Sequence, residues 1–519
     1  MPESGQRAST TATGAFAVLG AACALVPALA MWGFTVDDAL IPVRYAHNLA
    51  SGAGYRFDAR GASTDGVTPL PWAMLLAPLA GGGDAVVTLV RAKVLGVAAW
   101  TFAGAALGWR VGAIARGRAR ALRHAMLSAA GLVVMAIAFP LGAWAASGME
   151  TGVAMALATI AATRVGGGSG GGGRWWGSAV IAGGAAAFRP EMVVWAMVIG
   201  AGSGSEGEGE GESGSGSESE SESGSESGSG SGRARRGIFG AMMAVGPFVV
   251  CAVVRMIAFG RPAPLAVLAK PSDLSHGAIY VGAATLVVLT PLLVVAPFAL
   301  LRGGGQTARR EMRVARVLVG AFFAHALAVL AAGGDWMPYA RLMVPVAPSL
   351  VIAFAAITGT ARGSSFVTSL ARLAAAIVLG TLLVVRAAPA GRGVQADRAE
   401  LIAHARPVLR DAQKVAALDI GWVSASTDAS IVDLAGLTDP AIALLPGGHT
   451  SKRVDTAMLL DRGVDTVVIY SELRVVEARI VRSELFASRF ESTTQLPVGT
   501  RGASYTIYRL RRPPSSPPP

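Results

Sequence analysis

The sequence predicts a polytopic α-helical membrane protein, with about 11 spans and a small α/β domain at its carboxyl end. The 519 residues are 52% hydrophobic and only 15% charged, with a mean hydropathy of +0.51. This is far more apolar than a soluble chain of this length. Long apolar runs alternate with short arginine-rich loops as far as Arg386, and short β-branched runs follow it.

A helix needs roughly 20 mostly apolar residues to cross a bilayer, and broken helices use fewer. The predicted spans are 14–34, 84–109, 125–145, 151–164, 176–188, 191–202, 237–257, 278–301, 317–332, 342–360 and 367–386. The first lacks a small-residue cleavage site, so we interpret it as a retained anchor. Residues 68–80 are too short to span and contain three prolines, which indicates a re-entrant or interfacial helix.

Arginines cluster at 110–123, 233–236 and 302–316. With residues 1–13 in the cytoplasm, all three clusters are cytoplasmic, as the positive-inside rule requires. The sequence thus predicts an integral plasma-membrane protein whose loop 35–83 and carboxyl-terminal part lie outside the cytoplasm.

Residues 202–236 are mainly Gly, Ser and Glu, and this composition predicts a disordered cytoplasmic linker. We expect an extracytoplasmic α/β domain over 388–510, with strands at 415–420 and 466–470 and an edge strand at 504–510. Helical spacing appears at 398–413 and 454–460. The proline-rich residues 511–519 are predicted to be a disordered tail.

The net charge of +12 does not indicate nucleic-acid binding, because the arginines lie in short loops between apolar runs. No nucleic-acid partner is therefore predicted. The only two cysteines, Cys23 and Cys251, both lie in apolar runs, which excludes a disulfide framework and a thiolate metal cluster.

Asp37 and Asp38 follow the first apolar run, and ionisable residues at a membrane boundary indicate a functional site. If a helix begins at either aspartate, the other carboxylate caps it. Helical spacing then places Asp37, Arg44 and Asn48 on one face, with Tyr45 beside them. In this hypothesis one aspartate is a general base and Arg44 steers an anion. Asp37 is preferred as the base because Asp38 is the better placed cap. An N-cap with a surface ion pair is the alternative.

Three other motifs place charges at the predicted outer ends of spans. They contain the candidate substrate-binding residues Glu150, Arg189, Glu191, Asp335 and Arg341. Charges facing lipid would cost a few kcal/mol each, so we expect these side chains to face one another and a common polar cavity. Interfacial caps or snorkelling pairs are the alternative for each motif alone.

The six histidines are scattered without the spacing of a metal site, although His47 and His276 lie in outer loops where they could assist phosphate binding. No cofactor is predicted with certainty. Asp37 and Asp38 together with Glu150 could hold Mg²⁺ or Mn²⁺ through oxygen atoms, or Arg44 could neutralise a phosphate without a metal. No Gly-x-Ser-x-Gly nucleophile motif lies at a strand-to-helix turn.

Several motifs together resemble a GT-C class family of polytopic membrane glycosyltransferases that includes the terminal arabinofuranosyltransferases of cell-wall arabinan. They are Asp-Asp-Ala-Leu-Ile-x-x-Arg-Tyr-Ala-x-Asn-Leu from Asp37, Asp-Gly-x-Thr-Pro-Leu-x-Trp from Asp65, Ser-Gly-Met-Glu-Thr at 147–151, Arg-Pro-Glu at 189–191, Gly-Gly-Asp-Trp-Met-Pro at 333–338 with Arg341, and the segments 419–421 and 433–440.

The resemblance implies a glycosyltransferase domain over 14–387 in which loop 35–83 is catalytic. It implies a polyprenyl-phosphate-linked sugar as donor, a glycan or lipid-linked acceptor, an aspartate base at Asp37 or Asp38, and inversion at the sugar. Departures at Pro42, Asp65 and 339–342 leave the sugar open. A transporter or flippase of a lipid-linked glycan and a non-enzymatic membrane scaffold are the alternatives; the first would show paired interrupted helices as repeats.

Overall fold

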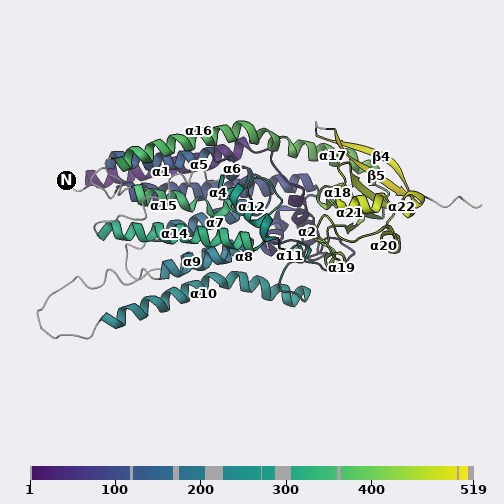
Figure 1. Ribbon diagram of the computed structural model, residues 1–519, viewed down its shortest axis with the longest axis horizontal. Coiled ribbons are helices and arrows are strands. Elements are labelled where there is room, and N and C mark those ends of the chain that lie inside the picture. The colour runs from purple at the N-terminus through teal and green to yellow at the C-terminus, as the bar shows by residue number, and fades with distance from the viewer. Residues whose placement is uncertain are drawn as a thin grey trace, which may run out of the picture. The chain divides into compact units, whose positions relative to one another are not determined.

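The computed structural model describes residues 3–116, 121–166, 175–204, 226–270, 272–286, 306–358, 364–499 and 502–511. The described part of the protein is mostly helical, with 69% of its residues in helices. The chain forms two compact units (Figure 1). Unit 1 contains Met1–Trp32, Val94–Val250 and Ser272–Pro389, and unit 2 contains Gly33–Lys93, Cys251–Pro271 and Ala390–Pro519.

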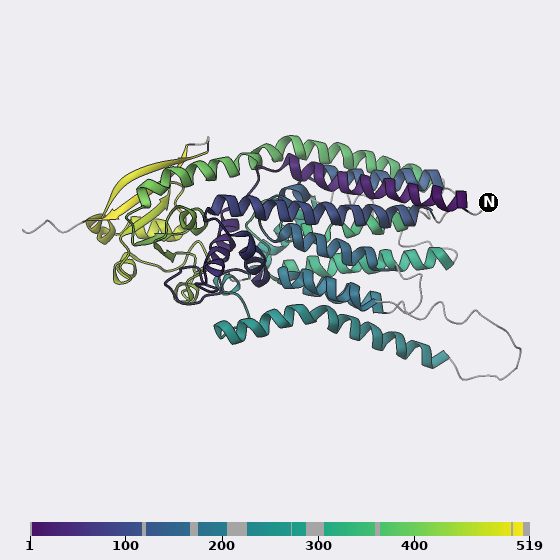
Figure 2. The same ribbon diagram turned by 180° about the vertical axis from the view of Figure 1, so that it is seen from behind.

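Unit 1 is built of helices, and the long ones run alongside one another in both ribbon views (Figures 1 and 2). The elements that begin in it, or that pass mostly through it, are α1 (Glu3–Ala30), α4 (Ala85–Arg116), α5 (Ala121–Ile137), α6 (Phe139–Ala145), α7 (Thr151–Arg164), α8 (Trp175–Phe188), η3 (Pro190–Met192), α9 (Val193–Gly204), α10 (Glu226–Phe259), α12 (Leu274–Ala284), α14 (Gln306–Ala331), η5 (Val344–Val346), α15 (Ser349–Thr358) and α16 (Ser364–Arg392).

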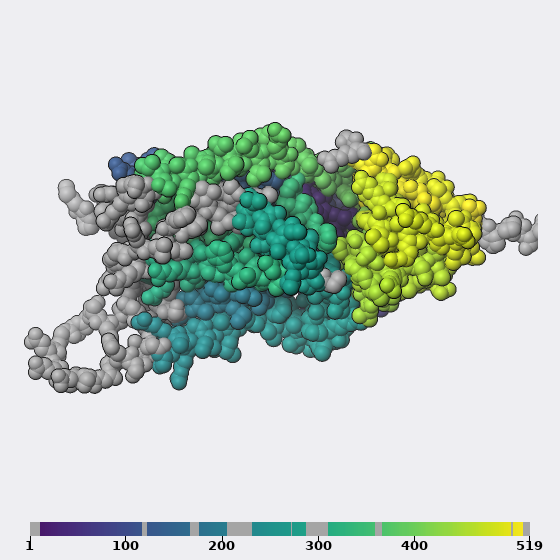
Figure 3. All heavy atoms as spheres, viewed as in Figure 1, coloured from purple at the N-terminus to yellow at the C-terminus, as the bar shows by residue number. Residues whose placement is uncertain are grey.

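Small residues allow α1 and α4 to approach closely. A Cβ atom built on Gly108 would lie 2.0 Å from the carbonyl oxygen of Phe16, and one built on Gly104 would lie 2.6 Å from Cβ of Ala24. Glycines four residues apart let the backbones of two apolar helices touch, which is the usual packing of helices in membranes. At the surface of the same unit, α12 (teal) lies against α14 (Figure 3).

Five helices in the described part of the chain are long and apolar enough to cross a membrane. They are Thr11–Ala30, Ala85–Arg116, Ser231–Phe259, Arg310–Ala331 and Phe366–Leu409. A sixth is obtained if α5 and α6 count as one span, although they bend by 58° near Pro140. These six correspond to predicted spans, so the prediction of a helical membrane protein is confirmed, whereas the count of about 11 is not.

The other predicted spans form short helices. The helices α7 and α8 have 14 residues each, α9 has 12 and α15 has 10. At 1.5 Å per residue, even 14 residues cover only about 21 Å of a roughly 30 Å hydrocarbon layer. All ten residues of α15 are buried within the protein. Its apolar character thus reflects packing against other helices. The predicted span at 278–301 lies partly outside the described residues.

Unit 2 joins the loop after α1 to the carboxyl-terminal domain. Its elements are η1 (Asp37–Ala39), α2 (Leu40–Ala50), α3 (Leu70–Leu76), η2 (Ala77–Leu79), α11 (Leu265–Ala269), α17 (Val394–Leu409), β1 (Lys414–Ala417), α18 (Ile420–Ser426), β2 (Ser430–Asp433), α19 (Pro440–Ala443), α20 (Thr456–Asp461), β3 (Thr466–Tyr470), α21 (Val475–Val481), α22 (Glu484–Arg489), β4 (Phe490–Val498) and β5 (Ala503–Leu510). The short helix predicted at 68–80 is present as α3 and η2.

The five strands form one sheet in the order β2-β1-β3-β5-β4. Strands β2, β1 and β3 are parallel, and β5 pairs antiparallel with both β3 and β4. The predicted small α/β domain is confirmed, and β3 has the predicted bounds. The prediction of β5 as an edge strand is wrong, because both of its sides are paired. The edge strands are β2 and β4. Exposed polar residues hide β4 from hydropathy analysis, and its Pro497 suits an edge.

The ends of the predicted linker at 202–236 belong to helices, since α9 continues to Gly204 and α10 begins at Glu226. Residues 205–225, and residues 512–519 of the predicted tail, lie outside the described part of the chain.

Candidate functional site

The two adjacent aspartates lie in η1 of unit 2, and the chain continues from η1 directly into α2. The residue before η1 is Val36, and no side chain caps either element. The predicted N-cap role of Asp38 is therefore wrong. The reason is that the turn is entered one residue earlier than expected, so that both aspartates lie inside it.

Asp37 caps a different helix. Its carboxylate accepts hydrogen bonds from the backbone N–H of Gly421 at 2.8 Å and of Trp422 at 2.9 Å, both at the start of α18. The approach is so close that a Cβ atom on Gly421 would lie 2.0 Å from the backbone oxygen of Asp37. The first loop and the carboxyl-terminal domain are therefore joined at this carboxylate.

Burial raises the pKa of the Asp37 carboxyl to about 6. The nearby guanidinium of Arg398 lowers this pKa, whereas the carboxylates of Asp419 and Asp38 raise it further. A carboxyl with a pKa near 6 changes its charge close to neutral pH, which is the range that general acid–base catalysis uses. Asp38 is half-buried, and in the described part of the chain its carboxylate has no hydrogen-bond or ion-pair partner.

The three predicted binding residues on α2 all form hydrogen bonds with other segments of unit 2. Arg44 donates to the carbonyl oxygens of Phe57, Ser424 and Thr427 and lies 3.6 Å from the exposed Asp428. The Tyr45 hydroxyl lies 2.9 Å from that of Thr64 and accepts the N–H of Gly66, and the Asn48 amide donates to the carbonyls of Arg56 and Phe57. These contacts fold the 55–66 segment onto α2, so the three side chains position the loop. Their direct contact with a substrate stays a prediction.

The remaining predicted residues come together in unit 1, in two linked ion-pair groups. Arg189 lies 2.7 Å from the Glu150 carboxylate and 2.9 Å from that of Glu191. These side chains are 4%, 2% and 13% exposed, so the guanidinium is enclosed by two carboxylates. One oxygen of Glu150 is buried without a hydrogen-bond partner among the described residues.

The second group follows α14. Arg341 donates to the Asp335 carboxylate at 2.7 Å, and its guanidinium lies 5.8 Å from the ring of Trp144. Its backbone oxygen accepts a hydrogen bond from Arg189 at 3.3 Å, which links the two groups. Tyr339 and Ala340 have φ values of +59° and +54°. Residues other than glycine rarely adopt this conformation, and strained turns of this kind are common at functional sites.

Two histidines hold the unit 1 loops in place. His325 of α14 is fully buried, with its ring nitrogens 3.2 Å from the carbonyl oxygen of Glu191 and 2.8 Å from that of Leu342. His276 lies 2.7 Å from the Gly333 carbonyl oxygen and stacks on Trp336. His47, in unit 2, lies 3.0 Å from the Thr88 hydroxyl. The predicted phosphate contacts of His47 and His276 are not tested by these packing contacts.

A second polar cluster in unit 2 was not predicted from the sequence. Asp419 follows β1 and pairs with Arg474, which follows β3, through contacts of 2.9 and 2.8 Å. Asp419 also accepts a hydrogen bond from Tyr505 of β5, and Arg474 donates to the buried Glu477. The sequence signal for this cluster was a charged residue within four positions of the end of each strand, since parallel strands bring their carboxyl ends to one edge.

A buried ion pair was also missed. The Nε atom of Arg255, in the last turns of α10, lies 2.6 Å from the Asp65 carboxylate, and the two side chains are 2% and 4% exposed. Because Arg255 lies within a predicted span, its charge requires an acidic partner. The sequence did not indicate which acidic residue is that partner.

Among the described residues, no group of three or more His, Cys, Asp or Glu side chains could hold a metal ion. The divalent cation proposed for Asp37, Asp38 and Glu150 stays a prediction. Cys23 and Cys251 are both buried and free.

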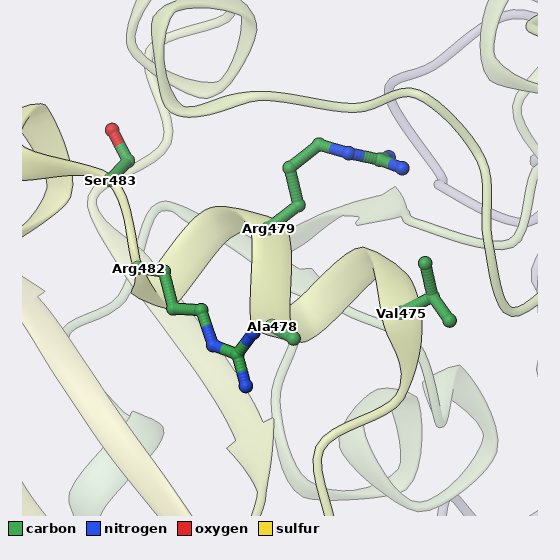
Figure 4. Close-up of a pocket in the computed structure, with 5 residues that line it drawn as sticks. All are labelled: Val475, Ala478, Arg479, Arg482 and Ser483. Carbon is green, nitrogen blue, oxygen red and sulfur yellow. The ribbon is translucent and has the colours of Figure 1, made fainter.

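A shallow surface pocket of about 490 Å³ lies along α21, lined by Val475, Ala478, Arg479, Arg482 and Ser483. Figure 4 shows the side chains of Arg479 and Arg482 pointing away from each other, so they do not converge on one ligand. Arg479 donates instead to the backbone oxygen of Lys452. We do not consider this pocket a candidate site.

No curated protein and no solved structure matches the chain. Residues 392–508, which contain the whole α/β part of unit 2 up to β5, match a family model described as a domain of unknown function (DUF8728).

Proposed function

We propose that this protein is a membrane glycosyltransferase that moves a sugar from a polyprenyl-phosphate donor to an extracytoplasmic glycan or lipid-linked acceptor. The observation that carries the proposal is the carboxylate pair in η1. Asp37 is fixed by two backbone N–H groups, and the adjacent Asp38 is half-buried without a partner in the described structure. One acid is thus held in place beside a second that is available to take a proton.

The geometry favours Asp38 as the base and Asp37 as the residue that positions it. In the proposed step, Asp38 takes the proton of an acceptor hydroxyl, whose oxygen forms a bond to the anomeric carbon of the donor sugar. The bond between that carbon and the phosphate oxygen breaks, and the lipid phosphate leaves with the electron pair. Attack from the face opposite the phosphate inverts the configuration.

In unit 1 the two arginines suit different roles. Arg189 is enclosed by Glu150 and Glu191, and we assign it to holding the loops. The Arg341 guanidinium lies 2.7 Å from the Asp335 carboxylate, and its side chain is 13% exposed. We assign Arg341 to the donor phosphate, since a guanidinium can donate two parallel hydrogen bonds to phosphate oxygens.

The membrane arrangement belongs to the same proposal. The arginine clusters of the sequence favour a plasma-membrane protein with a cytoplasmic amino terminus and an extracytoplasmic carboxyl-terminal domain. Further crossings by helices shorter than 18 residues would raise the number of spans above the five or six candidates toward the predicted 11.

The test is sugar transfer by the purified protein in lipid nanodiscs, with a polyprenyl-phosphate sugar as donor. We expect Asp38→Asn to lower kcat by about 10²–10⁴-fold, the usual range for loss of a general base. Asp411→Asn, which changes an exposed aspartate of the carboxyl-terminal domain, serves as the control. Full activity of both Asp37→Asn and Asp38→Asn would contradict the proposal. The lipid-linked sugar that accumulates in a deletion strain, identified by mass spectrometry, would name the donor.

A further inference from the structure

The parallel part of the unit 2 sheet contains a topological switch point. The chain leaves β1 through α18 and enters β2 on one side of β1, whereas β3 pairs with the other side of β1 and leads through α21 and α22 to β4. In open α/β sheets, ligands bind outside the carboxyl ends of the strands where the connections diverge in this way. Here that position lies between the ends of β1 and β3.

The side chains at these two strand ends are polar, ordered and partly exposed. Asp419 lies two residues after β1, and Arg474 lies four residues after β3. Arg474 donates to both oxygens of Glu477 at 2.6 and 2.7 Å while its other nitrogen holds both oxygens of Asp419. Glu477 is fully buried, whereas Asp419 and Arg474 are 21% and 24% exposed. The buried acid thus fixes a carboxylate–guanidinium pair that still reaches solvent.

Aromatic residues surround this pair. The Tyr505 hydroxyl donates to Asp419, and the Tyr505 ring lies 4.8 Å from that of Trp422 and 5.0 Å from that of Tyr470. Tyr470 is the last residue of β3 and is half-buried. The indole N–H of Trp422 is buried and has no hydrogen-bond partner in the described part of the chain.

We propose that this switch-point site, formed by Asp419, Tyr470, Arg474 and Tyr505, binds an uncharged sugar ring. Carboxylate oxygens accept and guanidinium nitrogens donate hydrogen bonds, so the pair matches the donor and acceptor capacity of neighbouring hydroxyl groups. Two arginines, Arg398 and Arg474, lie near this site, together with three acidic residues. The acidic residues are Asp37, Asp419 and Glu477, so negative charge is in slight excess. A phosphate or carboxylate ligand is disfavoured by this balance, whereas a neutral polyol is not.

The site connects directly to the proposed catalytic loop. Asp419 immediately precedes α18, and the next N–H groups, of Gly421 and Trp422, are those that hold Asp37. A sugar bound at Asp419 would therefore lie close to the anchored end of η1. If the proposed transfer reaction is correct, this sugar belongs to the acceptor, and the matched domain holds the glycan that is to be extended. This last assignment rests on the proposed function, whereas sugar binding itself does not.

Binding is measured on the full-length protein in nanodiscs by saturation-transfer NMR and calorimetry. The probes are a linear arabinofuranosyl hexasaccharide, maltohexaose and glucose 6-phosphate. We expect one of the two neutral oligosaccharides to bind, and its Kd to rise at least tenfold in Asp419→Asn and in Arg474→Gln. Arg482→Gln, on the exposed side of α21, is the matched control and keeps the wild-type Kd.

Tyr470→Ala tests the site without breaking an ion pair, and thermal unfolding shows whether each variant is folded. A folded Tyr470→Ala protein with weaker oligosaccharide binding supports the site. Wild-type affinity in the Asp419 and Arg474 variants, no binding of either neutral probe at millimolar concentration, or tighter binding of glucose 6-phosphate would overturn it. Asp38→Asn separates the two proposals, because it should lower kcat for transfer by about 10²–10⁴-fold and leave oligosaccharide binding unchanged.

Discussion

Asp37 shows how one carboxylate can be placed by residues far away in the sequence. Its two hydrogen-bond donors are 384 and 385 residues further along the chain. The motif from Asp37 to Asn48 could be singled out from the sequence because adjacent charges at the end of an apolar run are costly. Its partner could not, since backbone N–H groups have no sequence signature. Our proposal of Asp38 as the base therefore uses contacts that only the fold supplies.

Gly421 should tolerate no side chain. A methyl group there would collide with the backbone of Asp37, and relieving the collision must move η1 away from α18. We expect Gly421→Ala to lower the free energy of unfolding by about 1–3 kcal/mol, as for other overpacked sites, and to lower transfer activity more than tenfold. Thermal unfolding and the nanodisc assay measure the two effects.

Gly81→Ala is the matched control, because no atom lies within 4 Å of a Cβ atom built on Gly81 of the same unit. Equal behaviour of the two variants would show that α18 and η1 do not depend on each other.

Asp433 predicts a pH dependence of stability. Burial raises the pKa of its carboxyl to about 6, from an ordinary value near 4. The folded protein therefore holds this proton at pH values where the unfolded chain has released it. Stability from this group is fully present below pH 4 and is lost as the pH rises to 6. The unfolding temperature of wild type should fall between pH 4 and pH 6.

In Asp433→Asn this fall should be smaller, because the amide does not titrate. The exposed Asp411→Asn is the control and should keep the wild-type slope. Asp37, whose pKa is also raised to about 6, adds to the dependence in the same direction, so a residual slope is expected in Asp433→Asn. A slope that is unchanged by Asp433→Asn would contradict this account.

At the scale of elements, hydropathy identified the helices but did not show whether their apolar faces contact lipid or protein. The long helices α4, α10 and α14 were predicted because apolar length is a direct signal for a span. The short α7 and α15 have the same composition for another reason, namely burial inside unit 1. Composition cannot separate lipid from protein as the apolar neighbour, and for this reason the predicted count of about 11 spans is not confirmed by the five or six candidate helices of the described residues.

The pairing of charged side chains at the ends of these elements was predicted better than the number of spans. Glu150, Arg189, Glu191, Asp335 and Arg341 were expected to face one another, and their ion pairs confirm that they meet within unit 1. The argument succeeded because burying a lone charge costs several kcal/mol, which leaves pairing as the cheaper arrangement. Strands β2 and β4 escaped prediction because their apolar pattern is too short or too polar to stand out.

The ion pair between α10 and the loop after α2 should be critical for unit 2. Replacing Arg255 by Met leaves Asp65 buried without its partner, and we expect a loss of about 3–5 kcal/mol in the free energy of unfolding. The double variant Asp65→Asn with Arg255→Met should recover part of that loss. Chemical denaturation of the purified protein gives both values.

The control for Arg255→Met is Arg406→Met, which breaks an exposed ion pair. Its pair with Asp84 is 44% and 38% exposed, and exposed pairs contribute about 0–1 kcal/mol. If Arg255→Met were as stable as Arg406→Met, the buried pair would not hold α10 to the loop.

At the scale of the whole molecule, the main prediction is the side of the membrane on which each part lies. We expect a membrane-impermeant maleimide to label Glu472→Cys in intact spheroplasts, and to label Arg233→Cys only after permeabilisation. Both positions are exposed, and the native Cys23 and Cys251 are buried, so the background should be low. Labelling of both positions in intact spheroplasts, or of Arg233→Cys alone, would contradict the proposed orientation.

Unit 2 is assembled from three separate stretches of chain, and this has a consequence for biosynthesis. A ribosome adds about 5–20 residues per second, so the 384 residues between Asp37 and Gly421 take roughly 20 to 80 s to appear. During that interval the carboxylate pair has been made but the helix start that fixes it has not. The proposed catalytic loop therefore becomes ordered only near the end of translation, and a chain truncated before α18 would contain the acids of an enzyme without their geometry.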